Sequence, residues 1–162
     1  VDVGTGSGTI AVSLAHALPA VTVIASDIEA GALAVARANA ARHGVADRVR
    51  PVRGSLLGWL GRPVDLIAAN LPYLRPDQAH AGIAHEPAVA LYAGPDGFAL
   101  YRALLAQAPA RLRPGGRLLA EIDPDQADLA RATLAVVAPG WPVAVHADYA
   151  GRSRLVDLRC PD

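Results

Sequence analysis

The chain has 162 residues with 15 basic and 15 acidic side chains, so its formal net charge is zero, which argues against non-specific binding to nucleic-acid phosphates. Hydrophobic residues make up 52% of the chain and charged residues 19%, which is typical of one folded domain with a substantial core and excludes a disordered chain. No apolar run reaches the ~18 residues of a membrane span, and a single cysteine, Cys160, rules out an internal disulfide, so we expect a cytoplasmic protein.

The first element in the chain is a glycine-rich loop, Asp2-Val3-Gly4-Thr5-Gly6-Ser7-Gly8, and a strand is expected to end at Val3. Glycine tolerates positive φ and lets a ligand approach the backbone, and the helix expected over residues 9–18 would point its N-terminus at that ligand. Asp27 ends the next apolar run, at the spacing of a carboxylate that binds ribose hydroxyls. The pattern fits an S-adenosylmethionine loop, a G-x-G-x-x-A dinucleotide loop, or a turn that binds nothing.

Helical and extended patterns alternate through the rest of the chain. We expect further helices over residues 29–43, 96–112 and 126–137, and strands over residues 21–26, 48–53, 63–69, 117–122, 141–146 and 155–159. The intervening segments are expected to be a helical turn over residues 55–61, an irregular stretch over 71–95 and a turn at 114–116. Strands separated by helices predict an α/β fold with a mostly parallel sheet that is covered on both faces.

A second polar motif, Asn70-Leu71-Pro72-Tyr73, follows directly after the apolar run 63–69. Ligands of doubly wound sheets bind beyond the carboxyl ends of the strands, so this motif and the glycine loop are expected to share one cleft. The Asn70 side-chain oxygen and the Leu71 carbonyl can accept the two N–H bonds of a planar amide or amino group. Pro72 keeps Leu71 extended, and Tyr73 can pack on the flat group. Asn and Pro are also common in ordinary turns, which is the alternative interpretation.

Together these motifs resemble the HemK-type methyltransferases, which modify a glutamine side-chain amide of peptide chain release factors with S-adenosylmethionine. The middle and C-terminal segments single out this family, because glycine loops and Asn-Pro-Pro-Tyr motifs also occur in other methyltransferases, including amino-directed DNA methylases. These segments are residues 85–91, 94–97, Tyr101, residues 114–121, Gln126 and residues 148–154.

The resemblance implies a Rossmann-like S-adenosylmethionine-dependent methyltransferase fold, with a seven-stranded, mostly parallel sheet whose last strand is antiparallel. We expect residues 1–162 to form one catalytic domain without the N-terminal helical domain of the family. The cofactor S-adenosylmethionine is expected to contact Asp2, Gly4, Thr5, Gly6, Ser7, Gly8, Asp27, Ile28, Ser55, Leu56 and Asn70. The substrate is expected to contact Asn70, Leu71, Pro72 and Tyr73, with Asn70 and Tyr73 acting in catalysis. No metal is expected, and the partner would be a release factor rather than a membrane or nucleic acid.

The chain departs from the family at three positions. Leu71 replaces the first proline of the usual Asn-Pro-Pro-Tyr motif, and because its carbonyl is kept we expect the function to survive and Leu71→Pro to be tolerated. Ser55 replaces an aspartate near the adenine, and Asp123 replaces a glycine after the fifth strand. The alternative functions are an amino-directed nucleic-acid methylase, which the neutral charge disfavours, and a nucleotide-binding module without activity.

Overall fold

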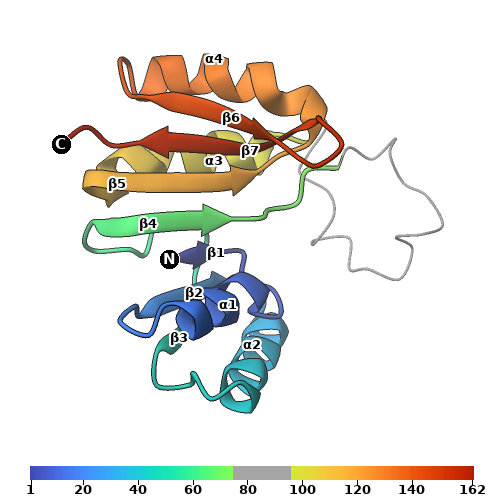
Figure 1. Cartoon of the computed structure of the whole chain (residues 1–162), viewed down its shortest axis with the longest axis vertical. Coiled ribbons are helices and arrows are strands. Elements are labelled where there is room, and N and C mark those ends of the chain that lie inside the picture. The colour runs from blue at the N-terminus through green and yellow to red at the C-terminus, as the bar shows by residue number, and fades with distance from the viewer. Residues whose placement is uncertain (75–95) are drawn as a thin grey trace.

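A computed structural model describes residues 1–74 and 96–162 of the chain. These residues form one sheet of seven strands with helices on both faces (Figure 1), in the strand order β3-β2-β1-β4-β5-β7-β6. The segments at residues 85–91 and 94–95, on which part of the family resemblance rests, lie outside the described residues.

The sheet is mostly parallel, as predicted. Strands β1 to β5 pair in parallel, whereas β7 runs antiparallel to both β5 and β6, so the last strand of the chain is the antiparallel one. The short strand β1 lies in the middle, between β2 and β4. The strands are β1 (Asp2–Val3), β2 (Val23–Asp27), β3 (Val49–Arg53), β4 (Val64–Ala69), β5 (Leu112–Glu121), β6 (Val143–Ala147) and β7 (Ser153–Arg159).

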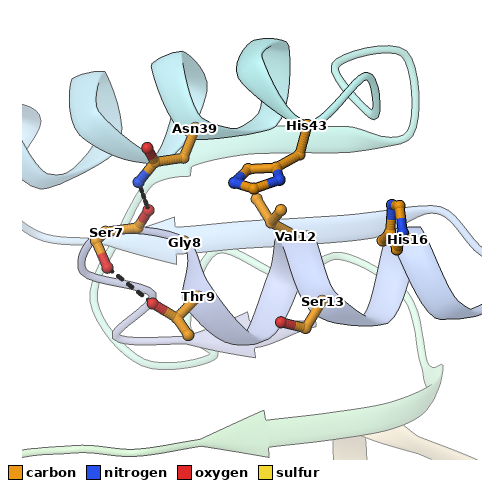
Figure 2. A pocket seen from close by; sticks show the side chains of 8 residues that line it. All are labelled: Ser7, Gly8, Thr9, Val12, Ser13, His16, Asn39 and His43. Atoms are coloured by element: carbon orange, nitrogen blue, oxygen red, sulfur yellow. Dashed lines mark hydrogen bonds between the residues drawn. The ribbon is translucent and has the colours of Figure 1, made fainter.

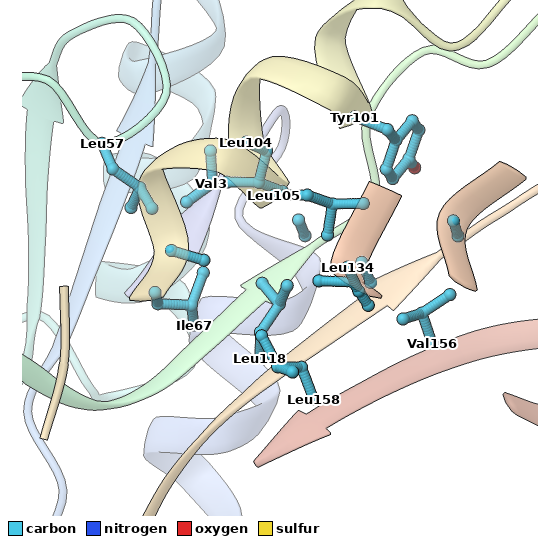
Figure 3. Packing of buried hydrophobic residues seen from close by; sticks show 14 of the residues in the cluster. Val3, Leu57, Ile67, Tyr101, Leu104, Leu105, Leu118, Leu134, Val156 and Leu158 are labelled. Atoms are coloured by element: carbon cyan, nitrogen blue, oxygen red, sulfur yellow. The ribbon is translucent and has the colours of Figure 1, made fainter. Parts of the chain in front are cut away.

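The helices cover the two faces of the sheet with different cores. Alternate residues of β2 show the two faces, because Val23 and Ala25 join a small cluster while Ile24 packs against a larger one. The small cluster lies under α1 and α2, and the larger one lies under α3 and α4. Figure 3 shows the packing of the larger cluster around Leu118 and Leu134. The helices are α1 (Thr9–Ala17), α2 (Ala30–Arg42), α3 (Ala99–Gln107) and α4 (Ala127–Val137).

The expected helix over residues 96–112 is too long at both ends. The α-helix α3 covers only Ala99–Gln107, and a 3-10 helix, Ala108–Arg111, follows it. Asp96 lies before the helix, where its carboxylate accepts the Phe98 N–H at 3.0 Å and pairs with Arg102. Pro109 has no N–H to give to an α-helical bond, which fits the change to a tighter turn there.

Two shorter predictions have different outcomes. Residues 55–61 contain the expected turn, in which Gly58 and Leu60 donate N–H bonds back to residues three positions earlier. Residues 114–116 lie inside β5, not between a helix and a new strand. They bulge out of the ladder, since Val64 pairs with Leu112 but the pairing resumes only between Leu66 and Arg117.

Asp123, which replaces a family glycine, is accommodated without strain. Its backbone is extended, with φ of −65° and ψ of 141°, so no glycine is needed there. Its side chain accepts the Asp125 N–H at 3.0 Å, and its own N–H donates to the Gln126 side chain at 3.2 Å. This reciprocal arrangement is a capping box at the start of the 3-10 helix Pro124–Gln126, which leads into α4.

Candidate functional site

The sheet brings the predicted site residues together at one edge. Strand β1 pairs with β2 and β4 on its two sides, so that Val3 lies opposite both Ser26 and Ala69. The three strands therefore end at the same level, and the segments that follow them are neighbours. These segments are the glycine loop, the turn after Asp27 and residues 70–73.

The glycine loop turns sharply at each of its three glycines. Gly4, Gly6 and Gly8 have φ of +69°, +53° and +84°, which L side chains rarely adopt. A Cβ added to Gly6 would find no atom within 4 Å, so open space lies in front of this residue. A Cβ on Gly8 would lie 2.9 Å from the Ala36 Cβ, so the back of the loop is closely packed against α2. The loop thus has a free side and a packed side, as a ligand cradle requires.

Asp2 lies beneath this loop and is 1% exposed. One carboxylate oxygen, Oδ2, accepts the Thr5 hydroxyl at 2.6 Å and the Ala11 N–H at 3.1 Å, so the side chain ties the loop to α1. The other oxygen, Oδ1, is buried without a hydrogen-bond partner among the described residues. Burial raises the pKa of the Asp2 carboxyl above its ordinary value, and the two hydrogen bonds oppose this effect.

Asp27 joins the glycine loop to the start of α2. Its Oδ2 accepts the Gly6 N–H and its Oδ1 accepts the Glu29 N–H, both at 2.9 Å. A carboxylate offers about four lone-pair sites, so these two bonds leave capacity for the two hydroxyls of a ribose. The neighbouring Ile28 is apolar yet 46% exposed, as suits a side chain that packs against a flat ring.

The expected adenine-side residues are held close to Asp27. Gly54 donates its N–H to the Asp27 carbonyl at 3.0 Å, and Arg53 donates a side-chain bond to the Ile28 carbonyl at 3.0 Å. These bonds place the segment with Ser55 and Leu56 directly beside the end of β2. Ser55 is exposed and Leu56 half-buried, and Leu56 has a left-handed φ of +47°. The residues present therefore fit a nucleoside with its ribose on Asp27 and its base between apolar side chains.

The motif at residues 70–73 lies against the glycine loop. A Cβ on Gly4 would lie 2.6 Å from Leu71 Cδ2 and 3.9 Å from the Asn70 carbonyl oxygen. The Asn70 side chain is exposed at the end of β4, whereas Leu71 is buried and Tyr73 is half-buried. The predicted cofactor and substrate residues are thus direct neighbours, in contact through Gly4 and Leu71.

Two further residues hold this motif, and the sequence alone assigned neither of them a role. The Tyr101 hydroxyl accepts the Leu71 N–H and donates to the Leu71 carbonyl, with both distances 3.0 Å. The Gln126 side-chain NH2 donates to the carbonyls of Tyr73 at 3.2 Å and Gly97 at 2.9 Å. Because these partners are separated by 30 residues in the first case and by 53 and 29 residues in the second, no local pattern could reveal the contacts.

Leu71 is therefore more than a neutral substitute for the family proline. Its N–H, which proline would lack, has a buried partner in Tyr101. That Leu71→Pro is tolerated stays a prediction, and the structure adds that the substitution would remove one of the two bonds to the Tyr101 hydroxyl and keep the bond to the carbonyl.

A pocket of about 280 Å³ lies behind the glycine loop, between α1 and α2 (Figure 2). It shares only Ser7 and Gly8 with the predicted cofactor residues, so it is distinct from the edge where Asp27 and Asn70 lie. Asn39 in its wall donates to the Ser7 carbonyl at 2.9 Å and supports the loop from behind. Its lining residues are Ser7, Gly8, Thr9, Val12, Ser13, His16, Asn39 and His43.

The described residues contain neither a metal-binding cluster nor a membrane-spanning helix. Within residues 1–74 and 96–162, no group of three or more His, Cys, Asp or Glu side chains is placed to hold a metal ion. Over the same residues, every helix is too short or too polar to cross a membrane.

Solved structures with the same fold include several methyltransferases. TrmN from Thermus thermophilus superposes with a TM-score of 0.71 at 28% identity, over 98% of this chain and 42% of that one. The ribosomal protein L11 methylase from Lactobacillus delbrueckii subsp. bulgaricus gives a TM-score of 0.68 at 25% identity, over 98% of this chain and 66% of that one. The predicted methyltransferase fold is confirmed.

Sequence comparisons identify the family. Residues 1–89 match the family model described as a methyltransferase domain. The chain is 45% identical to the release factor glutamine methyltransferase of Deinococcus radiodurans, over 98% of this chain and 56% of that protein. It is also 45% identical to the release factor glutamine methyltransferase of Moorella thermoacetica, over 94% of this chain and 56% of that protein. The chain thus spans about half the length of these relatives. It belongs to the methyltransferase domain family, and its predicted resemblance to the release factor glutamine methyltransferases is confirmed.

Proposed function

We propose that residues 1–162 form the catalytic domain of an S-adenosylmethionine-dependent methyltransferase that methylates a glutamine side-chain amide in a peptide chain release factor. The observation that carries this proposal is the direct contact between the glycine loop and the motif at residues 70–73, through Gly4 and Leu71. The names of the relatives, which are 45% identical to this chain, support the same reaction and substrate.

The proposed cofactor residues divide into three groups along the edge of the sheet. Gly4, Gly6 and Gly8 line the methionine end of S-adenosylmethionine, with the open space in front of Gly6 as the entry for the ligand. Asp27 binds the ribose, and the adenine lies between Ile28 and the segment with Ser55 and Leu56. Asp2 is buried and supports the loop from beneath through its bonds to Thr5 and Ala11.

The chemistry depends on how the substrate amide is held. A glutamine amide nitrogen is a weak nucleophile, since its lone pair is delocalised into the carbonyl, and S-adenosylmethionine would supply a strongly electrophilic methyl group. The Asn70 side-chain oxygen and the Leu71 carbonyl accept the two amide N–H bonds, which aligns the nitrogen with the methyl. The same two acceptors stabilise the positive charge that the nitrogen gains, and Tyr73 packs against the amide plane. The nitrogen loses its proton after transfer, so no strong base is required.

Replacement of Asn70 tests this proposal. Asn70→Ala should lower turnover by about 10²-fold, the loss typical for a transition-state hydrogen-bond partner, while S-adenosylmethionine affinity falls less. Asn70→Asp keeps a side-chain acceptor oxygen at this position and should retain more activity than the alanine variant. The turnover of both variants is measured by the transfer of a labelled methyl group to a release factor or to a glutamine-containing peptide. Full activity of Asn70→Ala would refute the mechanism, and label found only in DNA would favour the nucleic-acid methylase.

A further inference from the structure

The backbone of the substrate motif is fixed at Leu71 by one side chain. The N–H of Leu71 belongs to the peptide plane before this residue, and its carbonyl belongs to the plane after it. The Tyr101 hydroxyl bonds to both groups at 3.0 Å, so it fixes the two planes relative to each other. The position of the Asn70 side chain and the direction of the Leu71 carbonyl both depend on these planes.

Tyr101 is itself rigidly placed. It lies in α3 and is fully buried in the larger hydrophobic cluster, with its ring stacked on Phe98 at a centroid distance of 5.8 Å and an interplanar angle of 17°. Burial raises the pKa of its phenol above the ordinary value, so the hydroxyl stays protonated and able to donate at neutral pH. Because the Tyr101 hydroxyl is fixed in place, its bond holds the Leu71 carbonyl in one orientation.

A second buried side chain fixes the motif two residues further on. Gln126 is 6% exposed and uses all of its polar groups, because its NH2 donates to the carbonyls of Tyr73 and Gly97 and its oxygen accepts the Asp123 N–H. The motif is therefore held from the core at Leu71 and at Tyr73, on both sides of Pro72. Such support is what a site needs to keep reacting groups within a fraction of an ångström.

We propose, on the basis of the function proposed above, that Tyr101 is a positioning residue for methyl transfer. Its hydroxyl takes one lone pair of the Leu71 carbonyl and leaves the second lone pair directed at the substrate amide. The carbonyl and the Asn70 side chain then accept the two amide N–H bonds without reorganisation. Tyr101 acts through Leu71 and does not touch the substrate.

The test is Tyr101→Phe in the full chain, because phenylalanine keeps the ring and removes only the hydroxyl. Turnover at saturating peptide and S-adenosylmethionine should fall by about ten- to hundredfold, while the KM for S-adenosylmethionine stays within about twofold. The Leu71 amide proton, followed by hydrogen exchange in NMR, should lose its protection. Leu134→Ala is the control, since it opens a cavity in the same cluster, and it should lower Tm without lowering turnover in the folded protein.

Unchanged turnover in folded Tyr101→Phe would overturn the proposal, and so would a Leu71 amide that remains protected. A fall in turnover of the same size in Leu134→Ala would also overturn it, because the effect would then follow stability. If the unsubstituted protein transferred no methyl group to glutamine peptides, the proposed function would fail and the positioning role with it. That failure is distinguishable, because the Tyr101→Phe variant would still change the exchange of the Leu71 amide.

Discussion

The two halves of the site are held in different ways. The glycine loop is held by residues of β1, β2, α1 and α2: Thr5 and Ala11 donate to Asp2 across three and nine positions, Gly6 donates to Asp27 across 21, and Asn39 donates to the Ser7 carbonyl across 32. The motif at residues 70–73 is held by Tyr101 and Gln126, across 30 and 53 positions. The loop therefore takes its support from α1, α2 and the strands beside it, whereas the substrate motif takes its support from side chains of α3 and of the segment that leads into α4.

The hydrophobic clusters under the two halves also differ, in the size of their side chains. The cluster under α1 and α2 is built from small side chains, so the helices approach the loop closely. The cluster under α3 and α4 contains Phe98, Tyr101 and many leucines, and these larger side chains set the distance between the helices and the sheet. The cofactor half should thus tolerate added volume poorly, while the substrate half should be sensitive to lost hydrogen bonds.

The largest effect should come from added volume in the cofactor half. In Gly8→Ala the new Cβ would lie 2.9 Å from the Ala36 Cβ and 3.0 Å from its Cα, at a φ of +84°. The left-handed conformation costs about 1–2 kcal/mol and overpacking about 1–3 kcal/mol, so the free energy of unfolding should fall by about 2–5 kcal/mol. Gly6→Ala is the matched control, with positive φ but no atom within 4 Å of the Cβ. Urea denaturation gives the free energy of unfolding of both variants. An equal decrease in the two would contradict the argument that Gly8 is needed for packing against Ala36.

The next effect concerns the cofactor itself. Asp27→Ala removes the proposed ribose acceptor and also the bonds to the Gly6 and Glu29 N–H groups. A hydrogen bond to a charged group contributes about 1.5–3 kcal/mol, so S-adenosylmethionine should bind about ten- to hundredfold more weakly. Calorimetric titration of the folded variant gives the affinity. An unchanged dissociation constant would show that the ribose does not lie on Asp27.

A smaller, pH-dependent effect should come from Asp2. Burial raises the folded-state pKa of Asp2 above its ordinary value of 3.8. The protonated carboxyl is therefore favoured in the folded protein, and this stabilising contribution is complete below pH 3.8. It is lost as the pH rises through the folded-state pKa. Asp2→Asn cannot ionise, and its free energy of unfolding relative to the original protein should therefore increase with rising pH. Urea titrations at about pH 4 and about pH 8 compare the two. Identical pH dependence of both proteins would mean that Asp2 titrates normally.

The smallest effect should come from an exposed contact that is also long-range. Arg113 pairs with Asp65 across 48 positions at 2.8 and 3.0 Å, but the two side chains are 51% and 81% exposed. Exposed ion pairs contribute about 0–1 kcal/mol, so Arg113→Ala should barely change the denaturation midpoint. A large fall in the denaturation midpoint would show that the contribution of a contact to stability depends on its sequence separation rather than on its burial.

The sequence predicted the sheet better than the segments between its strands. The apolar runs that became β2 and β4 are bounded by clear polar or turn residues, so their positions and parallel direction followed from alternation with helices, whereas the antiparallel direction of β7 followed from the family resemblance. The sequence predicts a turn at residues 114–116, where the structure has a bulge, because Pro-Gly-Gly is typical of both. The end of α3 was missed because alanine and leucine continue through Pro109 into the 3-10 helix.

The site was predictable where its residues follow strand ends. The glycine loop, Asp27 and Asn70 lie together at one edge because the carboxyl ends of parallel strands coincide. The supporting residues could not be predicted in the same way. No pattern in the sequence around Tyr101 indicates a bond to Leu71, and none around Gln126 indicates a bond to Tyr73. Only the packing of α3 and α4 on the sheet brings these side chains to the motif.

Leu71 belongs to both halves at once. Its side chain lies over Gly4 of the cofactor loop, while its backbone is bound to Tyr101 and forms part of the proposed substrate site. Any movement of Gly4 on cofactor binding would therefore reach the proposed substrate acceptor through Leu71. By thermodynamic linkage the coupling is reciprocal: whatever factor the cofactor adds to the affinity for peptide, the peptide must add to the affinity for cofactor.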